Sequence, residues 1–444
     1  MIYDFVEINK NNNEPMYEQL YEQIKRGIVN GLIQKNEKLP SIRDASKELY
    51  VSRTTIENAY FRLCNEGYVE NKPQKGYFVK TPPKDKLPEE FLKPVENIKY
   101  DYDFSSDKID ASAADIPVWK KYVRSALNNE ADIASYGEPQ GEFCLRKAIA
   151  SYIYKARGVI SSPENIVVGA GIQQLITILC CIKKSGTVAI ETPGFKQAEK
   201  VFRDFGFNVV IIDSSATPKE ALEKSGADVY FNIPSLKPKT SAAALHTYRT
   251  SLLSWLNESE DHYIMEDDFN GELKFSARPF PAMQNMNTDR IIYMGSFSKL
   301  LIPSVRISYA VFPENIIRKY KEMSSYYNQT ASKTEQIALA KYIDDGYLEK
   351  HLRRLKKLYS NKSKVLLKEV NKAFPEGYAK VLESSLSIIF NPGTSLSDEE
   401  IIERTKAYKI KIQSVNNGQL RLSFAGIAVK EMKDAVERLS SSLI

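Results

Sequence analysis

The sequence is poor in the residues that form disulfide frameworks and zinc sites. Only four cysteines (Cys64, Cys144, Cys180 and Cys181) and three histidines occur among 444 residues. Four cysteines in a chain of this length do not make a disulfide framework, so we expect a reducing, cytoplasmic environment. The histidines lie far apart, and no cysteine–histidine cluster has zinc-site spacing, which predicts a protein without a bound metal.

Long apolar runs and a large excess of one charge are also missing. No stretch approaches the length needed to cross a bilayer. The first ten residues carry Asp4 and Glu7 instead of an apolar segment, so they do not resemble a secretory signal. The net charge of +6, from 62 basic and 56 acidic residues, is too small to demonstrate nucleic-acid binding. Evidence for such binding must therefore be local.

What is present is an ordinary globular composition in a chain long enough for more than one domain. The hydrophobic fraction is 43% and the charged fraction 27%, which excludes disorder and coiled coil for most of the chain. We expect an N-terminal module at residues 1–80, a linker at 81–100 with four prolines among charged residues, and a large body at 101–444.

The sequence of the N-terminal module predicts three helices followed by a β-hairpin. Apolar residues recur every four positions over 16–32, which predicts a helix with one buried face. Ser41 and Ser52 are predicted to cap two shorter helices, and Gly67 to end the second. Two short strands around a tight loop follow. This order predicts a winged helix-turn-helix.

In such a module the second helix of the helix-turn-helix enters the major groove of DNA, and its first residues meet the bases. Candidate DNA contacts are Arg53, Thr54 and Thr55 at the start of that helix, Arg43 in the preceding helix, and Lys75 and Gly76 at the tip of the wing. The alternative for each arginine is an ion pair with a nearby carboxylate on the surface.

Residues 39–69, L-P-S-I-R-D-A-S-K-E-L-Y-V-S-R-T-T-I-E-N-A-Y-F-R-L-C-N-E-G-Y-V, closely resemble the GntR-type winged helix of bacterial repressors. The resemblance implies DNA contacts by Arg43, Arg53, Thr54, Thr55 and the wing around Gly76. The wing itself, N-K-P-Q-K-G-Y-F-V, departs from the short basic-glycine turn usual in that family.

Beyond residue 100, short β-rich runs alternate with helical stretches, which predicts a mostly parallel sheet covered on both faces. The seven runs are 166–168, 187–191, 208–212, 228–232, 263–266, 290–294 and 307–312. From about residue 330 we expect a long helical region, strands near 386–390 and 419–424, and a final helix. The fold class is therefore α/β with a smaller C-terminal α+β part.

A lysine, a carboxylate pair and a glycine turn follow three of these runs. Lys299 closes the segment Y-M-G-S-F-S-K, Asp267 follows the strand Y-I-M-E, and V-G-A-G-I-Q-Q (168–174) leads into a helix. Pyridoxal phosphate needs such an inventory: an amine for its aldehyde, a carboxylate for its ring nitrogen, and hydroxyl, cationic or N–H groups for its phosphate. Each element alone is more often an ordinary surface or turn feature, and it is their order that favours a site.

The body resembles the fold type I aminotransferases, and specifically the aminotransferase-like domain of MocR/GabR regulators. The matching pieces are Y-G-E-P-Q-G (136–141) with Leu145-Arg146, A-R-G-V (156–159), G-A-G-I-Q-Q (169–174), E-T-P-G-F (191–195), E-D-D-F (266–269), S-F-S-K (296–299) and R-L-S-F (421–424).

This resemblance implies a role for each matched site residue. Lys299 would form the Schiff base with the cofactor, Asp267 would pair with the pyridine nitrogen, and Phe195 would stack on the ring, where the family usually has tyrosine. Arg421 would take the carboxylate of an amino-acid ligand. The phosphate would be surrounded by Gly171, Ile172, Gln173, Ser296, Ser298 and Arg306, with Tyr136 reaching the phosphate of the neighbouring subunit.

Two departures from the family concern the cofactor. Phe269 stands where the family has a tyrosine, and the segment P-S-L-K-P-K-T (234–240) lacks the usual histidine and glycine.

The sequence thus predicts a transcriptional regulator that binds operator DNA and senses an amino acid or related amine through pyridoxal phosphate. The resemblance implies a homodimer whose DNA modules are exchanged between subunits. The alternatives are a competent aminotransferase with a DNA-binding appendage, and a regulator that has lost the cofactor.

Overall fold

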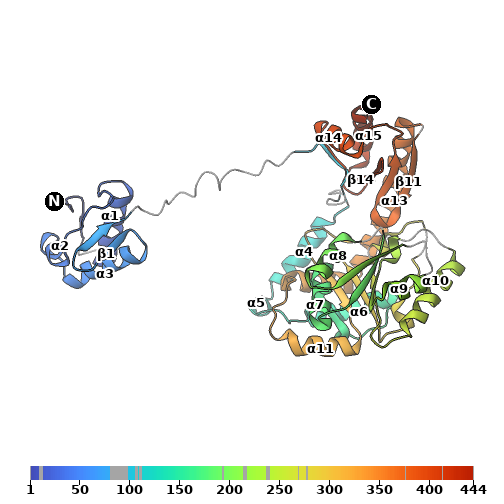
Figure 1. The fold of residues 1–444 in the computed structure, drawn as a ribbon, viewed down its shortest axis with the longest axis horizontal. Coiled ribbons are helices and arrows are strands. Elements are labelled where there is room, and N and C mark those ends of the chain that lie inside the picture. The colour runs from blue at the N-terminus through green and yellow to red at the C-terminus, as the bar shows by residue number, and fades with distance from the viewer. Residues whose placement is uncertain are drawn as a thin grey trace. The chain divides into compact units, whose positions relative to one another are not determined.

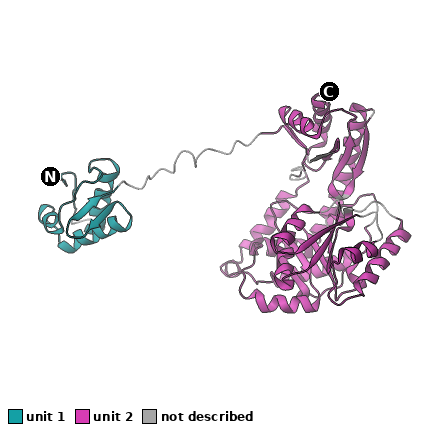
Figure 2. Ribbon diagram, viewed as in Figure 1, with its two compact units in different colours: residues 1–97 teal, residues 98–444 magenta. Residues whose placement is uncertain are grey.

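The computed structural model describes residues 2–9, 14–80, 99–105, 109, 113–192, 195–213, 218–236, 241–268, 270–276, 279–375, 377–412 and 414–443. The chain divides into two compact units, residues 1–97 and 98–444 (Figure 2). Most of the predicted linker, residues 81–98, lies outside the described residues.

The N-terminal unit is the predicted winged helix-turn-helix. Its elements are α1 (Met16–Val29), α2 (Ile42–Glu48), α3 (Arg53–Asn65), β1 (Val69–Lys72) and β2 (Gly76–Val79). Ser41 accepts a hydrogen bond from the backbone N–H of Asp44 at 3.2 Å, and Ser52 accepts one from that of Thr55 at 3.1 Å. Each cap satisfies an N–H group that has no partner within its helix, so both predicted helix starts are confirmed.

The core of this unit lies between α1 and α3. Leu20, Ile24 and Ile28 of the predicted stripe are buried against α3. The prediction for the end of the stripe was wrong, because α1 ends at Val29 and Leu32 is 63% exposed. The chain turns at Gly31, where φ is +76°, so apolar spacing beyond that point no longer describes one helix face.

The larger unit is built on a seven-stranded sheet in the order β4-β10-β9-β8-β7-β5-β6, which confirms the predicted α/β class (Figure 1). Strand β10 runs antiparallel to both of its neighbours, β4 and β9, whereas the other neighbouring strands of this sheet run parallel to each other. The strands are β4 (Ile166–Gly169), β5 (Thr187–Thr192), β6 (Asn208–Asp213), β7 (Val229–Asn232), β8 (Tyr263–Asp267), β9 (Ile291–Ser296) and β10 (Ser308–Val311).

Both faces of this sheet are buried, as expected for strands connected by helices. Val167 and Ile292 pack on the face covered by α7, α8 and α11, whereas Val168 and Tyr293 pack on the opposite face against α4, α6 and α12. The helices are α4 (Ile116–Leu127), α5 (Glu130–Ile133), α6 (Phe143–Arg157), α7 (Ile172–Lys183), α8 (Lys196–Asp204), α9 (Pro218–Ser225), α10 (Ala242–Leu256), α11 (Glu314–Ser324) and α12 (Lys333–Asp344).

The C-terminal part is joined to the sheet by the long helix α13 (Tyr347–Ala373). It holds a second sheet in the order β11-β12-β15-β14, and β13 pairs with β3. The remaining elements are β3 (Tyr102–Asp103), β11 (Tyr378–Leu382), β12 (Ser387–Asn391), α14 (Asp398–Ala407), β13 (Ile410–Lys411), β14 (Ser414–Asn416), β15 (Gln419–Ser423) and α15 (Met432–Leu443). Across the described ranges, no helix has both the length and the apolar character needed to cross a membrane.

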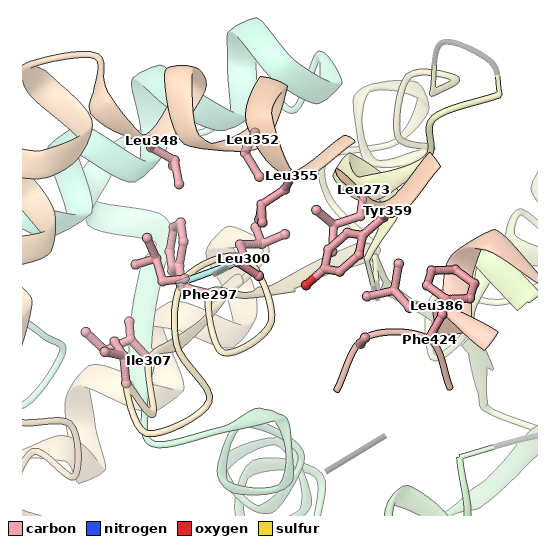
Figure 3. Packing of buried hydrophobic residues seen from close by; sticks show 14 of the residues in the cluster. Leu273, Phe297, Leu300, Ile307, Leu348, Leu352, Leu355, Tyr359, Leu386 and Phe424 are labelled. Atoms are coloured by element: carbon pink, nitrogen blue, oxygen red, sulfur yellow. The ribbon is translucent and has the colours of Figure 1, made fainter. Parts of the chain in front are cut away.

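Helix α13 also supports the turn that carries Lys299. Leu348, Leu352 and Leu355 point from α13 into the cluster that contains Phe297 and Leu300 (Figure 3). Phe297 and Leu300, on either side of Lys299 in the sequence, are buried in this cluster and anchor the turn. Lys299 itself is half-buried.

Candidate functional site

Most of the predicted cofactor residues of the body meet along one edge of the seven-stranded sheet. The carboxyl ends of β4, β8 and β9 lie at this edge, and so does the start of β10, because β10 is antiparallel. Ser308, the first residue of β10, pairs with Gly169 on one side and Ser296 on the other. Ligands of open α/β sheets bind at the carboxyl ends of the strands.

A cradle for an anion forms where β4, β9 and β10 meet. Gly171 has φ of +138°, and a Cβ there would lie 2.9 Å from Nη2 of Arg306, so the guanidinium approaches the glycine backbone as only glycine allows. Arg306 Nη1 donates to Ser298 Oγ at 3.3 Å, and Ser308 Oγ donates to Ser296 Oγ at 2.9 Å. A guanidinium, hydroxyls and a helix N-terminus together suit a phosphate group.

The other residues predicted around the phosphate lie in the same place. Ile172 and Gln173 are the first two residues of α7, and Gln173 is exposed. Lys299 follows Ser298 in the turn after β9. The structure therefore brings together the three separate segments 171–173, 296–299 and 306.

Asp267 is a buried carboxyl group without a cation. It ends β8 and is 3% exposed, and none of the ion pairs in the described part of the chain includes it. Burial, and then the charge of Asp268, raise the pKa of Asp267 to about 7. A cationic partner would remove this penalty, so the site fits a group that offers a protonated nitrogen.

Two buried polar groups, one at the end of β7 and one three residues later, were not predicted as site residues. Asn232 ends β7, next to β8, and its Nδ2 is buried with no hydrogen-bond partner among the described residues. The Oγ of Ser235 is also buried and has no hydrogen-bond partner among the described residues. Such groups are costly unless a ligand or water satisfies them. An asparagine at the last position of the predicted strand 228–232 was the available signal for the first.

Phe195 precedes α8 and is partly buried against the core beneath the sheet. Phe269 and residues 237–240, the two departures from the family pattern, lie outside the described residues. Their effect on the cofactor stays a prediction.

Arg421 lies on β15, in the C-terminal part. It is half-buried, its Nε is buried without a hydrogen-bond partner in the described chain, and burial lowers the pKa of its guanidinium. A guanidinium in this state is ready to receive a carboxylate. Tyr136, by contrast, is 94% exposed in the single chain.

In the N-terminal unit, the predicted DNA contacts divide into exposed and buried groups. Arg43, Arg53 and Thr54 are exposed, and neither arginine takes part in an ion pair with any other described residue. Thr55 is only 9% exposed, and its Oγ1 lies 2.8 Å from Oγ of Ser52. Its hydroxyl therefore belongs to the helix cap, and the exposed surface is made by the other three side chains.

The wing is the tight hairpin that joins β1 to β2. Lys75 is exposed, and Gly76 has φ of +101° at the start of β2. The aliphatic end of Lys38 lies 3.2 Å from the position of a Cβ at residue 76, which adds a second lysine beside the tip. In the described residues, no cluster of histidine, cysteine, aspartate and glutamate could hold a metal ion.

Two family models match the chain. Residues 16–79 match the bacterial regulatory proteins of the gntR family, and residues 101–439 match aminotransferase class I and II. The chain is 32% identical to the HTH-type transcriptional regulator YdeL of Bacillus subtilis (strain 168), over 98% of each chain. It is 26% identical to the probable rhizopine catabolism regulatory protein MocR of Rhizobium meliloti, over 98% of this chain and 95% of that one.

Solved aminotransferases share the fold of the body. The multiple substrate aminotransferase of Thermococcus profundus superposes with a TM-score of 0.66 and 22% identity, covering 80% of this chain and 94% of that one. The α-aminoadipate aminotransferase LysN of Thermus thermophilus gives a TM-score of 0.67 and 21% identity, covering 77% and 91%. With the regulator relatives that match from end to end, these findings place the chain in the MocR-type family of transcriptional regulators, in which a GntR-type helix-turn-helix domain is joined to an aminotransferase class I and II domain.

Proposed function

We propose that this regulator binds pyridoxal 5'-phosphate and senses an amino acid or related amine at Lys299. The observation that carries the proposal is Asp267, a buried carboxyl group without a cation, at the same sheet edge as an anion cradle. A cofactor with a phosphate at one end and a protonated ring nitrogen at the other would satisfy both.

The cradle would hold the phosphate through the side chains of Arg306, Ser296 and Ser298 and through the backbone N–H groups at the N-terminus of α7. Asp267 would hold the ring nitrogen, and the unpartnered amide of Asn232 offers a donor to an oxygen on the ring. When bound, the cofactor supplies an aldehyde that reacts with amines. An amine effector that took the place of the Lys299 ε-amino group would release that side chain.

Arg421 would select the effector. Its buried Nε has no acceptor among the described residues, and a guanidinium binds a carboxylate through two parallel hydrogen bonds. Effectors that carry a carboxylate should therefore bind more tightly than simple amines.

The N-terminal unit would bind operator DNA through Arg43, Arg53 and Thr54, with Thr55 holding the helix start and Lys75 and Gly76 at the wing. The two arginines are exposed and unpaired within the described chain, which favours DNA contact over the surface ion pair. The relatives support regulation, because one is named a regulator of pyridoxine biosynthesis and another a rhizopine catabolism regulatory protein.

We propose a homodimer with exchanged DNA modules. Tyr136 is 94% exposed in one chain. In the proposed dimer, this exposed side chain would contact the site of the second copy.

The second candidate is a competent aminotransferase, favoured by the complete set of Lys299, Asp267 and Arg421. Turnover of amino acids with 2-oxo acids at about one per second or above would support it, since enzymes reach that range.

The cofactor itself is tested by absorbance. Purified protein should be yellow, or become so with added pyridoxal phosphate, and a protein that stays colourless would refute the proposal.

A further inference from the structure

Asp268, the neighbour of Asp267, is held by a buried guanidinium. Arg157, the last residue of α6, donates from Nε to Asp268 Oδ2 at 2.5 Å and from Nη2 to Oδ1 at 3.1 Å. The side chains of Arg157 and Asp268 are 6% and 1% exposed. Tyr293 Oη adds a third hydrogen bond to Oδ2 at 2.7 Å. Both carboxylate oxygens of Asp268 therefore accept hydrogen bonds from buried protein groups.

The backbone around Asp268 is shaped to this orientation. A Cβ at Gly271 would lie 2.1 Å from Asp268 Oδ1, so the carboxylate occupies space that any other residue at 271 would fill. The backbone N–H of Asp268 donates to the carbonyl of Met294 at 3.0 Å, which fixes the strand end. Of two adjacent carboxyl groups, one is thus fixed toward Arg157 and the other is left without a cation.

Arg157 lies in a region crowded with acidic groups. Titratable and charged groups that act on Arg157 or on these two carboxyl groups are Glu266, Glu272, Arg249, Lys356, Tyr152, Tyr293 and Tyr309. Glu266 is satisfied by the backbone N–H groups of Met283 and Gln284. Arg157 forms an ion pair with Asp268, and no second basic side chain of the described chain does so.

We propose that Arg157 is a positioning residue for Asp267: by balancing much of the charge of Asp268, it limits the repulsion that Asp267 meets as the ionised carboxylate facing the ring nitrogen of the cofactor. This inference rests on the proposed binding of pyridoxal phosphate. It assigns a function to the Arg157 of the A-R-G-V segment and to the second aspartate of E-D-D-F.

The sign of the effect follows from where the charges lie. A carboxylate at Asp268 without Arg157 would sit directly beside Asp267 in the chain, with no cation to balance it. In a buried site, a negative charge at short range disfavours the ionised form of a neighbouring carboxyl group. The proton shared between Asp267 and a ring nitrogen would then shift toward Asp267, and the nitrogen would lose its charge.

A structural tie between α6 and β8 is the other explanation for the pair. One feature speaks against it as the whole explanation: Nη1 of Arg157 is buried with no hydrogen-bond partner among the described residues. A neutral donor such as glutamine would join the two elements without burying that group.

The test compares wild type with R157M, D268N and the double variant R157M/D268N, each as the full chain loaded with pyridoxal phosphate. The protonation of the ring nitrogen is read by ¹⁵N NMR of labelled cofactor between about pH 6 and 9, and the dissociation constant of the cofactor is measured over the same range. Thermal melting of each cofactor-free protein reports the structural part separately. R157K, which keeps the charge but loses the planar fork, is the matched control.

We expect R157M to lose protonation of the nitrogen as pH rises, and to bind the cofactor at least tenfold more weakly at the upper end of the range than at the lower end. The double variant and R157K should keep the wild-type profile, even if their melting temperatures fall. A wild-type profile in R157M, or an R157M-like profile in the double variant, would overturn the proposal.

If R157M does not fold, D268N decides the matter. It leaves the guanidinium of Arg157 without its carboxylate, a change of charge opposite to that in R157M. We therefore expect the ring nitrogen to stay protonated to higher pH than in wild type, with the wild-type profile restored in the double variant; a wild-type profile in D268N would overturn the proposal. If wild type itself binds no pyridoxal phosphate, the proposed function has failed, whereas normal wild-type binding with an unaltered R157M contradicts this inference alone.

Discussion

The two units present their candidate functional side chains in opposite ways. In the winged helix, Arg43 and Arg53 are exposed and free of ion pairs with other described residues. In the body, Asp267 is buried and forms no ion pair with another described residue. Buried Asn232 and half-buried Arg421 each have a nitrogen that lacks a hydrogen-bond partner within the described ranges. Exposed cations suit an extended polyanion, which is recognised without enclosure. Buried groups suit a small ligand, because interactions are stronger where water is excluded.

The sharpest test of the enclosed site is Lys299→Ala, for which we expect complete loss of the absorbance of a cofactor joined to lysine. The amine that reacts with the aldehyde is removed, while Phe297 and Leu300, which pack the turn, remain. Absorbance spectra and chemical unfolding of both proteins would be measured. An unchanged spectrum in a folded variant would place the reactive lysine elsewhere.

Asp267→Asn should stabilise the cofactor-free protein at pH 8. The pKa of Asp267 is raised from 3.8 to about 7 by burial, so the native state binds the proton more tightly than the unfolded state does. The wild type therefore loses stability as pH rises from about 4 to 7, by up to about 4 kcal/mol from this group. The variant should lose less over this range.

Chemical denaturation at pH 5 and pH 8 would measure the difference. Glu266 and Glu272, whose pKa values burial raises to about 7, keep their own slopes in both proteins. Equal slopes in the two proteins would show that Asp267 is not the ionisable group that the enclosed site must compensate.

Arg421→Lys should weaken an amino-acid effector by about 1.5–3 kcal/mol, the value of hydrogen bonds to a charged group. Lysine keeps the charge but cannot form two parallel bonds to a carboxylate. A simple amine should be affected much less, and titration of the absorbance with both ligands measures the contrast. Equal losses for the two ligands would remove Arg421 from the ligand site.

Arg53→Ala tests the exposed side of the comparison and should weaken operator binding by about 1–3 kcal/mol if the arginine reads a guanine. If it contacts phosphate instead, the loss should be independent of sequence and the salt slope should fall by about one. Anisotropy titrations with operator and unrelated DNA at several salt concentrations would separate these cases. Folding stability should change little, because the side chain is exposed and has no ion pair in the described chain.

Local features of the structure could be predicted from the sequence, and distant pairings could not. Ser41 and Ser52 cap their helices as expected, because a cap depends on residues three positions apart. The seven strands lie within a few residues of the predicted runs, because alternation of strands and helices is read locally.

Two features of the sites show the limit. Arg157 and Asp268 are 111 positions apart, and only the packing of α6 against the end of β8 brings them together. Thr55 is predicted to contact DNA from its position, and its hydroxyl lies 2.8 Å from that of Ser52 in the helix cap, a contact that only the structure shows. The spacing of residues in the sequence does not show where a side chain points in the fold, so contacts that depend on its direction could not be predicted.

We propose that ligand binding at the site around Lys299 changes the affinity of the winged helix for operator DNA. The most direct measurement is operator affinity of the full-length protein with pyridoxal phosphate, in the absence and presence of an amino acid that changes its absorbance, for wild type and Lys299→Ala. We predict that the amino acid shifts operator affinity by about fivefold or more in wild type, a typical allosteric coupling, and leaves the variant unchanged. Equal operator affinity in wild type with and without that amino acid would contradict the account.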